Sequence, residues 1–151
     1  ATLAPAGTSE KLADEDGTSE ARQDGIEVPA RSLRLLLVED HEATLQVLTR
    51  LLSRAGHQVV PTDSVCAALA AAEEGIFDLV ISDLGLPDGT GNELMKILRE
   101  RYQLQGLALT GYGMEEDLER SRQSGFTAHL IKPVDFSQLR RALLPFQQDV
   151  E

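Results

Sequence analysis

The stretch DLVISDLGLPDG, residues 78–89, decides the fold of this chain. Its apolar run, Leu79-Val80-Ile81, is typical of a strand buried on both faces, and the strand ends on a carboxylate, Asp83. A loop built from Gly, Pro and Asp follows. A buried strand usually meets its loop without a charge at the junction, so the acid at this position needs an explanation.

From residue 33 onward, apolar runs alternate with amphipathic segments. The apolar runs predict strands, and the amphipathic segments, with periods near 3.6 residues, predict helices. We expect strands over residues 33–40, 57–62, 77–83, 106–111 and 128–133, and helices over 41–56, 64–75, 92–102, 114–125 and 135–146. Strands that alternate with helices of roughly 10 to 15 residues indicate βαβ units. The fold class is therefore α/β: a doubly wound, five-stranded parallel sheet with helices on both faces.

Several single residues refine this prediction. Pro61 suggests that the strand over 57–62 lies at a sheet edge, because proline lacks the N–H that a central strand needs. Ser64 is placed to cap the helix that follows it, and Asp135 and Gln138 have the spacing of a capping box.

Composition limits the function classes. The chain has 151 residues, of which 42% are apolar and 26% charged, as in a soluble domain of ordinary size. No apolar run approaches the roughly 20 residues that cross a bilayer. The formal charge of −11 argues against sequence-independent binding to nucleic acid or anionic lipid. One cysteine, Cys66, allows no internal disulfide and favours a cytoplasmic setting; we expect it to pack within its helix.

Residues 1–32 differ from the rest of the chain. They are rich in Ala, Gly, Ser, Asp and Glu, and they contain no aromatic residue and no apolar period. Such a segment buries too little surface to offset the entropy of ordering it. We therefore predict a disordered acidic linker over 1–32 and a folded domain over 33–148.

Polar side chains stand at the carboxyl ends of four predicted strands. Glu39 and Asp40 end the first strand, Asp83 the third and Thr110 the fourth, and Lys132 follows the fifth. In doubly wound sheets, ligands bind beyond these strand ends, where the strand order reverses. We therefore expect the five side chains to form one site.

Three carboxylates at one place repel each other unless a cation joins them. Mg²⁺ suits oxygen ligands and sites that also hold phosphate, with Mn²⁺ as a substitute. Thr110 is able to donate to a phosphoryl oxygen, Lys132 to neutralise its charge, and one carboxylate to act as the nucleophile. These residue types predict phosphoryl transfer onto an aspartate.

At this point the sequence resembles the receiver domains of two-component response regulators. The resemblance covers roughly residues 33–148 and rests on LLLVED, DLVISDLGLPDGTG, LALTG and LIKPV, which occur in the family's order and spacing. It implies a CheY-like, flavodoxin-like fold with strand order 2-1-3-4-5. It also implies that Asp83 accepts a phosphoryl group from a phosphohistidine, which would explain an acid at the end of a buried strand.

The resemblance also assigns roles around Asp83. Asp40 and Asp83 would hold the Mg²⁺ with the Gly85 backbone carbonyl, and Glu39 would act through water. Thr110 would be the switch hydroxyl and Lys132 the phosphate-binding lysine, with the Lys-Pro pair indicating a cis peptide.

Three positions bear on the lifetime of the phosphoryl group or on the switch. The switch aromatic position, three residues before the lysine, holds His129 instead of Tyr or Phe. Gly85 offers a carbonyl but no side chain, and Tyr112 places a bulky ring two residues after Thr110.

The implied partners are a histidine kinase or a histidine phosphotransfer domain. A homodimer through the fourth helix, fifth strand and fifth helix is a further possibility. The upstream linker, with no basic recognition helix after the domain, favours the C-terminal receiver of a hybrid sensor histidine kinase. A free-standing single-domain response regulator is the alternative.

Two other interpretations of the same residues fit the sequence less well than a receiver domain, and the phosphohydrolase is kept only as a remote alternative. An aspartate-nucleophile phosphohydrolase normally needs a second Asp two residues after the first, where this chain has Gly85. A non-phosphorylatable pseudo-receiver would be expected to lack Asp83 or Lys132. We interpret His41 as the residue that opens the first helix and His57 as a turn residue.

Overall fold

The computed structural model describes residues 31–111 and 115–148. Most of the predicted linker, residues 1–30, lies outside the described residues, and so does Tyr112.

The core of the fold is a parallel sheet of five strands in the order β2-β1-β3-β6-β7. These strands are β1 (Arg34–Val38), β2 (Gln58–Thr62), β3 (Leu79–Asp83), β6 (Gln105–Thr110) and β7 (Phe126–Ile131). The predicted order 2-1-3-4-5 is confirmed, since the labels differ only because a two-stranded antiparallel hairpin intervenes. That hairpin, β4 (Gly85–Leu86) with β5 (Gly89–Thr90), was not predicted.

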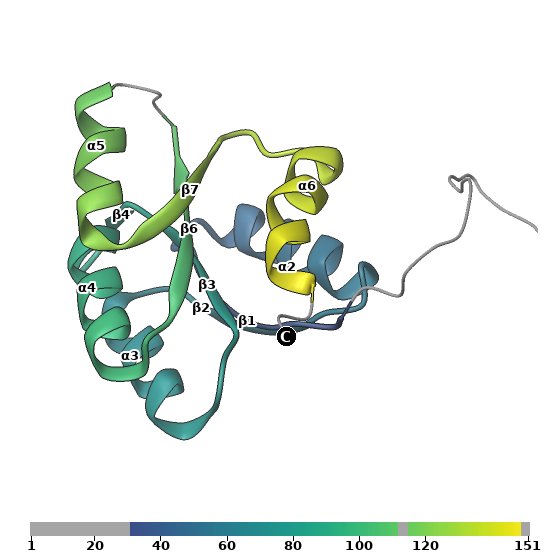
Figure 1. Ribbon diagram of the computed structural model, residues 1–151, viewed down its shortest axis with the longest axis horizontal. Helices are drawn as coiled ribbons and strands as arrows, with labels where there is room; N and C mark the ends of the chain where they lie inside the picture. Colours follow the sequence, from purple (N-terminus) through teal and green to yellow (C-terminus); the bar gives the residue numbers. More distant parts are fainter. Residues whose placement is uncertain (1–30, 112–114, 149–151) are drawn as a thin grey trace, which may run out of the picture. The chain divides into compact units, whose positions relative to one another are not determined.

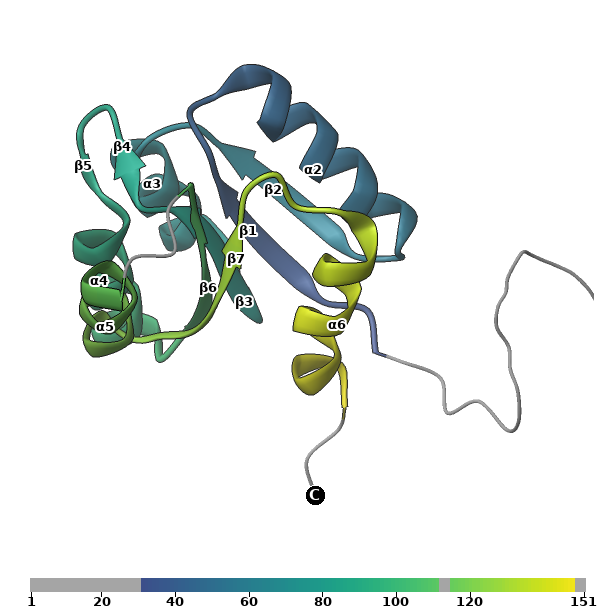
Figure 2. The ribbon, with the colours of Figure 1, turned by 90° about the horizontal axis from the view of Figure 1, so that it is seen from above.

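Helices cover both faces of the sheet, as predicted (Figure 1). They are α2 (Glu42–Arg54), α3 (Val65–Glu74), α4 (Gly91–Tyr102), α5 (Glu115–Ser124) and α6 (Phe136–Gln147). The view from above shows α2 and α6 on one face and α3, α4 and α5 on the other (Figure 2).

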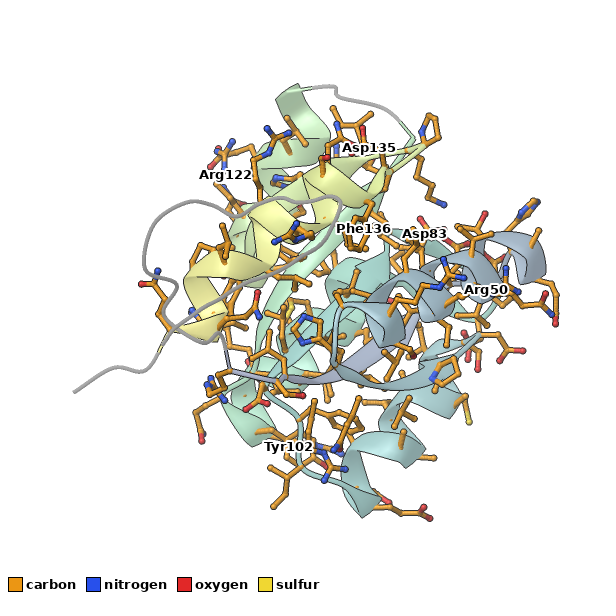
Figure 3. The ribbon with its side chains drawn as sticks, turned by 90° about the vertical axis from the view of Figure 1, so that its right-hand side faces the viewer. Arg50, Asp83, Tyr102, Arg122, Asp135 and Phe136 are labelled. Atoms are coloured by element: carbon orange, nitrogen blue, oxygen red, sulfur yellow. The ribbon has the colours of Figure 1, made fainter. Side chains whose placement is uncertain are left out.

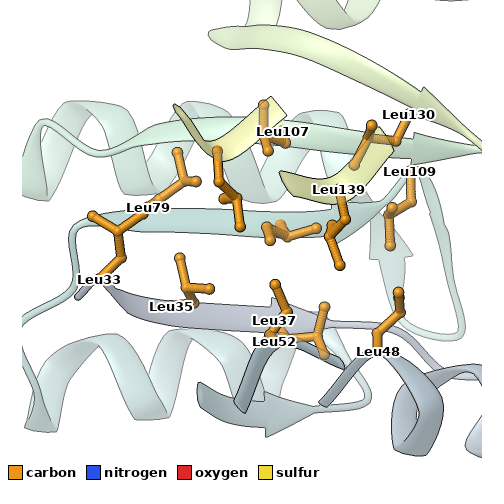
Figure 4. Packing of buried hydrophobic residues seen from close by; sticks show 12 residues of the cluster. Leu33, Leu35, Leu37, Leu48, Leu52, Leu79, Leu107, Leu109, Leu130 and Leu139 are labelled. Atoms are coloured by element: carbon orange, nitrogen blue, oxygen red, sulfur yellow. The ribbon is translucent and has the colours of Figure 1, made fainter. Parts of the chain in front are cut away.

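The two faces of the sheet bury two apolar clusters because successive strand residues point to opposite sides. In β1, Leu35 and Leu37 pack against α2 and α6, while Leu36 and Val38 pack against α3 and α4. Figure 4 shows the first cluster, which is composed largely of leucine. Burial on both faces explains why the central strands read as continuous apolar runs.

The helix ends confirm several local predictions. Ser64 caps α3 by accepting a hydrogen bond from the N–H of Ala67. Asp135 and Gln138 form the predicted capping box of α6. The peptide bond between Lys132 and Pro133 is cis, as the Lys-Pro pair indicated.

Two predictions about single residues were wrong. Cys66 is exposed, because it occupies the second position of α3 and points away from the sheet-facing side on which Ala68 and Ala72 are buried. His57 is not a turn residue: it lies between the turn at Ala55 and Gly56 and the start of β2, it is 6% exposed, and its Nδ1 accepts a hydrogen bond from the N–H of Leu33.

Arg31 and Ser32 contact the domain, although the sequence predicted them to be part of the linker. The Arg31 guanidinium bonds to Asp78 and to the carbonyl of Phe146, and the Ser32 hydroxyl donates to the carbonyl of Gly56. Among the helices of the described residues, none has both the length and the apolar character needed to cross a membrane.

The environment of His57 predicts a pH dependence of stability. Burial lowers the pKa of His57 from its usual 6.5. The unfolded chain therefore binds this proton more readily than the folded one. The stability contributed by the neutral ring is complete above about pH 6.5 and is lost as the pH falls below it. His57→Gln retains an acceptor for Leu33, so its free energy of unfolding should vary less with pH, as measured by urea denaturation.

Burial also lowers the pKa of His129, so His129 adds its own pH dependence to the stability of the parent and of His57→Gln. The contribution of His57 is therefore the difference between the two curves of unfolding free energy against pH. Parallel curves for the parent and His57→Gln would contradict the prediction.

Candidate functional site

The predicted site residues meet at one edge of the sheet. Asp83 is the last residue of β3, Thr110 is the last residue of β6, and Lys132 directly follows β7. Glu39 and Asp40 directly follow β1. Parallel pairing puts all these strand ends on the same side. In Figure 3, Asp83 lies toward the end of the molecule that carries Asp135, and away from Tyr102.

Three carboxylates form the centre of this edge. One carboxylate oxygen from each of Glu39, Asp40 and Asp83 lies within 4.8 Å of the other two. Oxygen donors at this spacing are the ligands that a hard divalent cation such as Mg²⁺ takes, so the donor set fits the predicted ion.

The Lys132 ammonium joins two of these acids. Its Nζ donates to Glu39 Oε1 at 3.0 Å and to Asp83 Oδ2 at 2.8 Å. Burial alone would lower the pKa of Lys132, but the hydrogen bonds and negative charges of Asp83 and Glu39 outweigh it and raise the pKa. Lys132 therefore stays cationic.

Glu39 and Asp40 are adjacent in the sequence but differ in burial and in their hydrogen bonds. Glu39 is fully buried, and its second oxygen, Oε2, accepts a hydrogen bond from the backbone N–H of His41 at 3.0 Å. Burial raises the pKa of Glu39, while the His41 and Lys132 contacts act in the opposite direction. Asp40 is exposed at the same edge. As predicted, His41 opens the helix that follows, where it is the N-cap residue of α2.

The backbone at the start of α4 packs closely against the backbone of Asp83. A Cβ on Gly91 would clash with the carbonyl oxygen of Asp83, so the first residue of α4 has to be glycine for the two segments to approach. The N–H of Gly91 donates to the carbonyl of Leu84 at 2.8 Å. Gly85 is exposed, and space is open where its side chain would be.

Thr110 and His129 extend the site along β6 and β7. Thr110 is buried at the end of β6, and its carbonyl accepts from the N–H of Lys132 at 2.8 Å. His129 is half-buried and pairs with Ala108 in the sheet. Its Nε2 forms a hydrogen bond with the hydroxyl of Ser121, which lies on α5 and is fully buried. Burial, and next the charge of Arg122, lower the pKa of His129.

Two of the contacts near this edge were not predicted from the sequence. The Ser121–His129 hydrogen bond joins residues on different elements, and a serine in a polar helix gives no signal of it. Asp88, which reads as a turn residue between Pro and Gly, accepts hydrogen bonds from the N–H groups of Val65 and Cys66.

Residues 35–144 match the family described as the response regulator receiver domain. The chain belongs to this family. It is thus a receiver domain of two-component signal transduction, and its fold and strand-end residues agree with that assignment.

Curated relatives of this receiver domain match it over only part of their own length. The response regulator protein FleR of Pseudomonas aeruginosa is 37% identical over 112 residues, which are 74% of this chain and 23% of FleR. The virulence sensor protein BvgS of Bordetella bronchiseptica is 33% identical over 142 residues, covering 89% of this chain and 12% of BvgS. The chain therefore spans less than a quarter of either protein.

Solved structures agree with the receiver fold. The chemotaxis response regulator CheY4 of Vibrio cholerae has 30% identity and a TM-score of 0.72, with 76% of this chain and 98% of that chain covered. The non-phosphorylated HemR receiver domain of Leptospira biflexa has 27% identity and a TM-score of 0.71, with 78% and 96% covered.

The contacts of Lys132 predict its contribution to stability. Lys132→Met should lower the free energy of unfolding by about 2 kcal/mol, because the buried Glu39 carboxylate loses its cationic partner. Urea denaturation without divalent cations measures this. Lys96→Met, a change of an exposed lysine on α4, is the matched control and should have little effect. Equal losses in the two variants would contradict the prediction.

Proposed function

We propose that Asp83 accepts a phosphoryl group from a phosphohistidine of a histidine kinase or a histidine phosphotransfer domain. The observation that carries the proposal is the contact of the Lys132 ammonium with Asp83 at 2.8 Å, inside a cluster of three carboxylates. This arrangement holds an oxygen nucleophile next to a fixed positive charge at the open edge of a rigid sheet.

The transfer is a displacement at phosphorus. A carboxylate oxygen of Asp83 forms the new P–O bond while the P–N bond to the donor imidazole breaks, and the imidazole leaves with the electron pair of that bond. Lys132 neutralises charge on the phosphoryl oxygens, and the Thr110 hydroxyl donates a hydrogen bond to one of them. Hydrolysis of the Asp83 phosphoryl group returns the domain to its initial state.

Asp40, Asp83 and the Gly85 carbonyl would hold Mg²⁺, with Glu39 acting through a water molecule. The ion supplies charge neutralisation and orientation for the phosphoryl oxygens. Mn²⁺ is the expected substitute, because it accepts the same oxygen ligands.

The phosphoryl group would switch the face formed by α5, β7 and α6. It adds roughly two negative charges at the sheet edge, and Thr110 would move toward them. His129 occupies the neighbouring switch position on β7, where Ser121 holds its ring against α5. Displacement of this ring would change the surface offered to a partner, including a second copy of the chain.

The parent protein is proposed to be a cytoplasm-facing hybrid sensor histidine kinase that contains this receiver. The match to the sensor protein BvgS, which covers 89% of this chain, supports it. The alternative is a free-standing regulator. The polar-differentiation response regulator DivK of Brucella ovis is 33% identical over 103 residues, which are 84% of DivK. The coding sequence upstream of Ala1 distinguishes the two.

The phosphorylation proposal is tested with a small phosphodonor. With acetyl phosphate and Mg²⁺, the protein should gain one hydroxylamine-labile phosphoryl group, detected by mass spectrometry, and Asp83→Asn should gain none. Asp63→Asn, at an exposed acid after β2, is the matched control and should be labelled like the parent. Labelling of Asp83→Asn at the parent's level would remove Asp83 from this role.

The two acids that follow β1 should differ in metal binding. Asp40→Asn should weaken Mg²⁺ binding by about tenfold or more, whereas Glu39→Gln should weaken it much less. The reason is that Lys132 and the N–H of His41 already occupy both oxygens of the buried Glu39 carboxylate, while Asp40 is exposed. Calorimetric titration measures both constants. Equal losses would mean that both carboxylates are direct ligands.

A further inference from the structure

The loop that follows Asp83 is attached to two different helices. At one end, the Thr90 hydroxyl accepts from the N–H of Glu93, and the Glu93 carboxylate accepts from the N–H of Thr90, so the loop caps α4. In its middle, Asp88 reaches across to α3, a helix that ends before β3 begins. The loop is therefore held from both sides.

The contact of Asp88 with α3 uses both carboxylate oxygens. Oδ1 accepts from the N–H of Val65 at 2.8 Å, and Oδ2 accepts from the N–H of Cys66 at 2.9 Å. The first N–H groups of a helix have no partner within the helix, and a carboxylate at this end is favoured by the helix dipole. These two hydrogen bonds lower the pKa of Asp88. Asp88 thus stays an anion that binds two donors at once.

Helix α3 is a firm attachment point. Ala68 and Ala72 bury its inner side against the sheet, and Ser64 separately caps it through Ala67. Gly89 also approaches α3 closely, since a Cβ there would lie 3.2 Å from a methyl group of Val65. A loop tied to these first residues of α3 is held relative to the core.

The position of Gly85 depends on the attachment of the loop to α3. Apart from the adjacent residues Leu84 and Leu86, no residue has an atom within 4 Å of the point where its Cβ would be, so packing around a side chain does not position it. It is placed instead by its pairing with Thr90 in the small hairpin, whose connection contains Asp88. The orientation of the Gly85 carbonyl therefore follows from where Asp88 and Thr90 fix the hairpin.

We propose that Asp88 is a positioning residue for metal binding, acting through the hairpin to aim the Gly85 carbonyl at the acidic cluster. The inference rests on the proposed function, in which that carbonyl is a ligand of Mg²⁺. Asp88 itself does not touch the ion. Its carboxylate fixes the loop relative to α3 through the hydrogen bonds to Val65 and Cys66.

The test compares two caps of the same helix. Asp88→Ala and Ser64→Ala each remove side-chain acceptors from the first turn of α3, but only the first releases the hairpin. Magnesium titration followed by calorimetry should give a dissociation constant about tenfold higher for Asp88→Ala, at the lower end of effects seen for partners that orient a metal ligand. Ser64→Ala should bind like the parent. In the metal-free proteins, the Gly85 amide signal in nitrogen–proton NMR spectra should move only in Asp88→Ala.

Loss of a negative charge near the site is a separate effect, and Asp63→Asn controls for it. Asp63 is an exposed acid immediately before Ser64, and no hydrogen bond of its side chain occurs within the described residues. Asp63→Asn should bind Mg²⁺ like the parent, while Asp88→Asn, which retains one acceptor oxygen, should fall between the parent and Asp88→Ala.

Three outcomes would overturn the inference. They are equal dissociation constants for Asp88→Ala and Ser64→Ala, an effect of Asp63→Asn as large as that of Asp88→Ala, or an unmoved Gly85 amide in Asp88→Ala. In each of these the parent still binds Mg²⁺, and the proposed function stands. A parent that binds no Mg²⁺ would overturn the proposed function and this inference together.

Discussion

The structure depends on one ammonium group shared between two acids. Lys132 contacts Glu39, which is fully buried, and Asp83, which is partly exposed. An unpaired carboxylate buried as completely as Glu39 would cost several kcal/mol or be protonated. By neutralising part of the acidic cluster, Lys132 allows three carboxylates to stand at one sheet edge. The same contact links the ends of β1, β3 and β7.

The elements and the acidic site were predictable from the sequence because both follow from local patterns. Continuous apolar runs identify strands buried on both faces, and the residue that ends each run must lie at the sheet edge. Asp40, Asp83 and Lys132 were located by this reasoning alone. The resemblance to receiver domains added the strand order, which periodicity does not contain.

The missed features are contacts between distant parts of the chain. His57 looks like a turn residue in its own segment, and its buried partner is the N–H of Leu33, which lies 24 residues earlier, directly before β1. Asp88 likewise looks like a turn residue until α3 is placed beside it. The exposure of Cys66 depends on the side of α3 that meets the sheet, which an alanine-rich helix hardly specifies. Composition and periodicity carry no information about such partners.

The attachments of the loop after Asp83 also restrict its length. Surface loops usually tolerate insertions, because their ends are the only fixed points. Here the N–H of Gly91 is bonded to the carbonyl of Leu84, Asp88 is bonded to α3, and Thr90 is bonded to α4, all within a few residues. One added residue would break at least one of these contacts. Among the connections at this edge of the sheet, this one is therefore a poor place to graft a tag or an epitope.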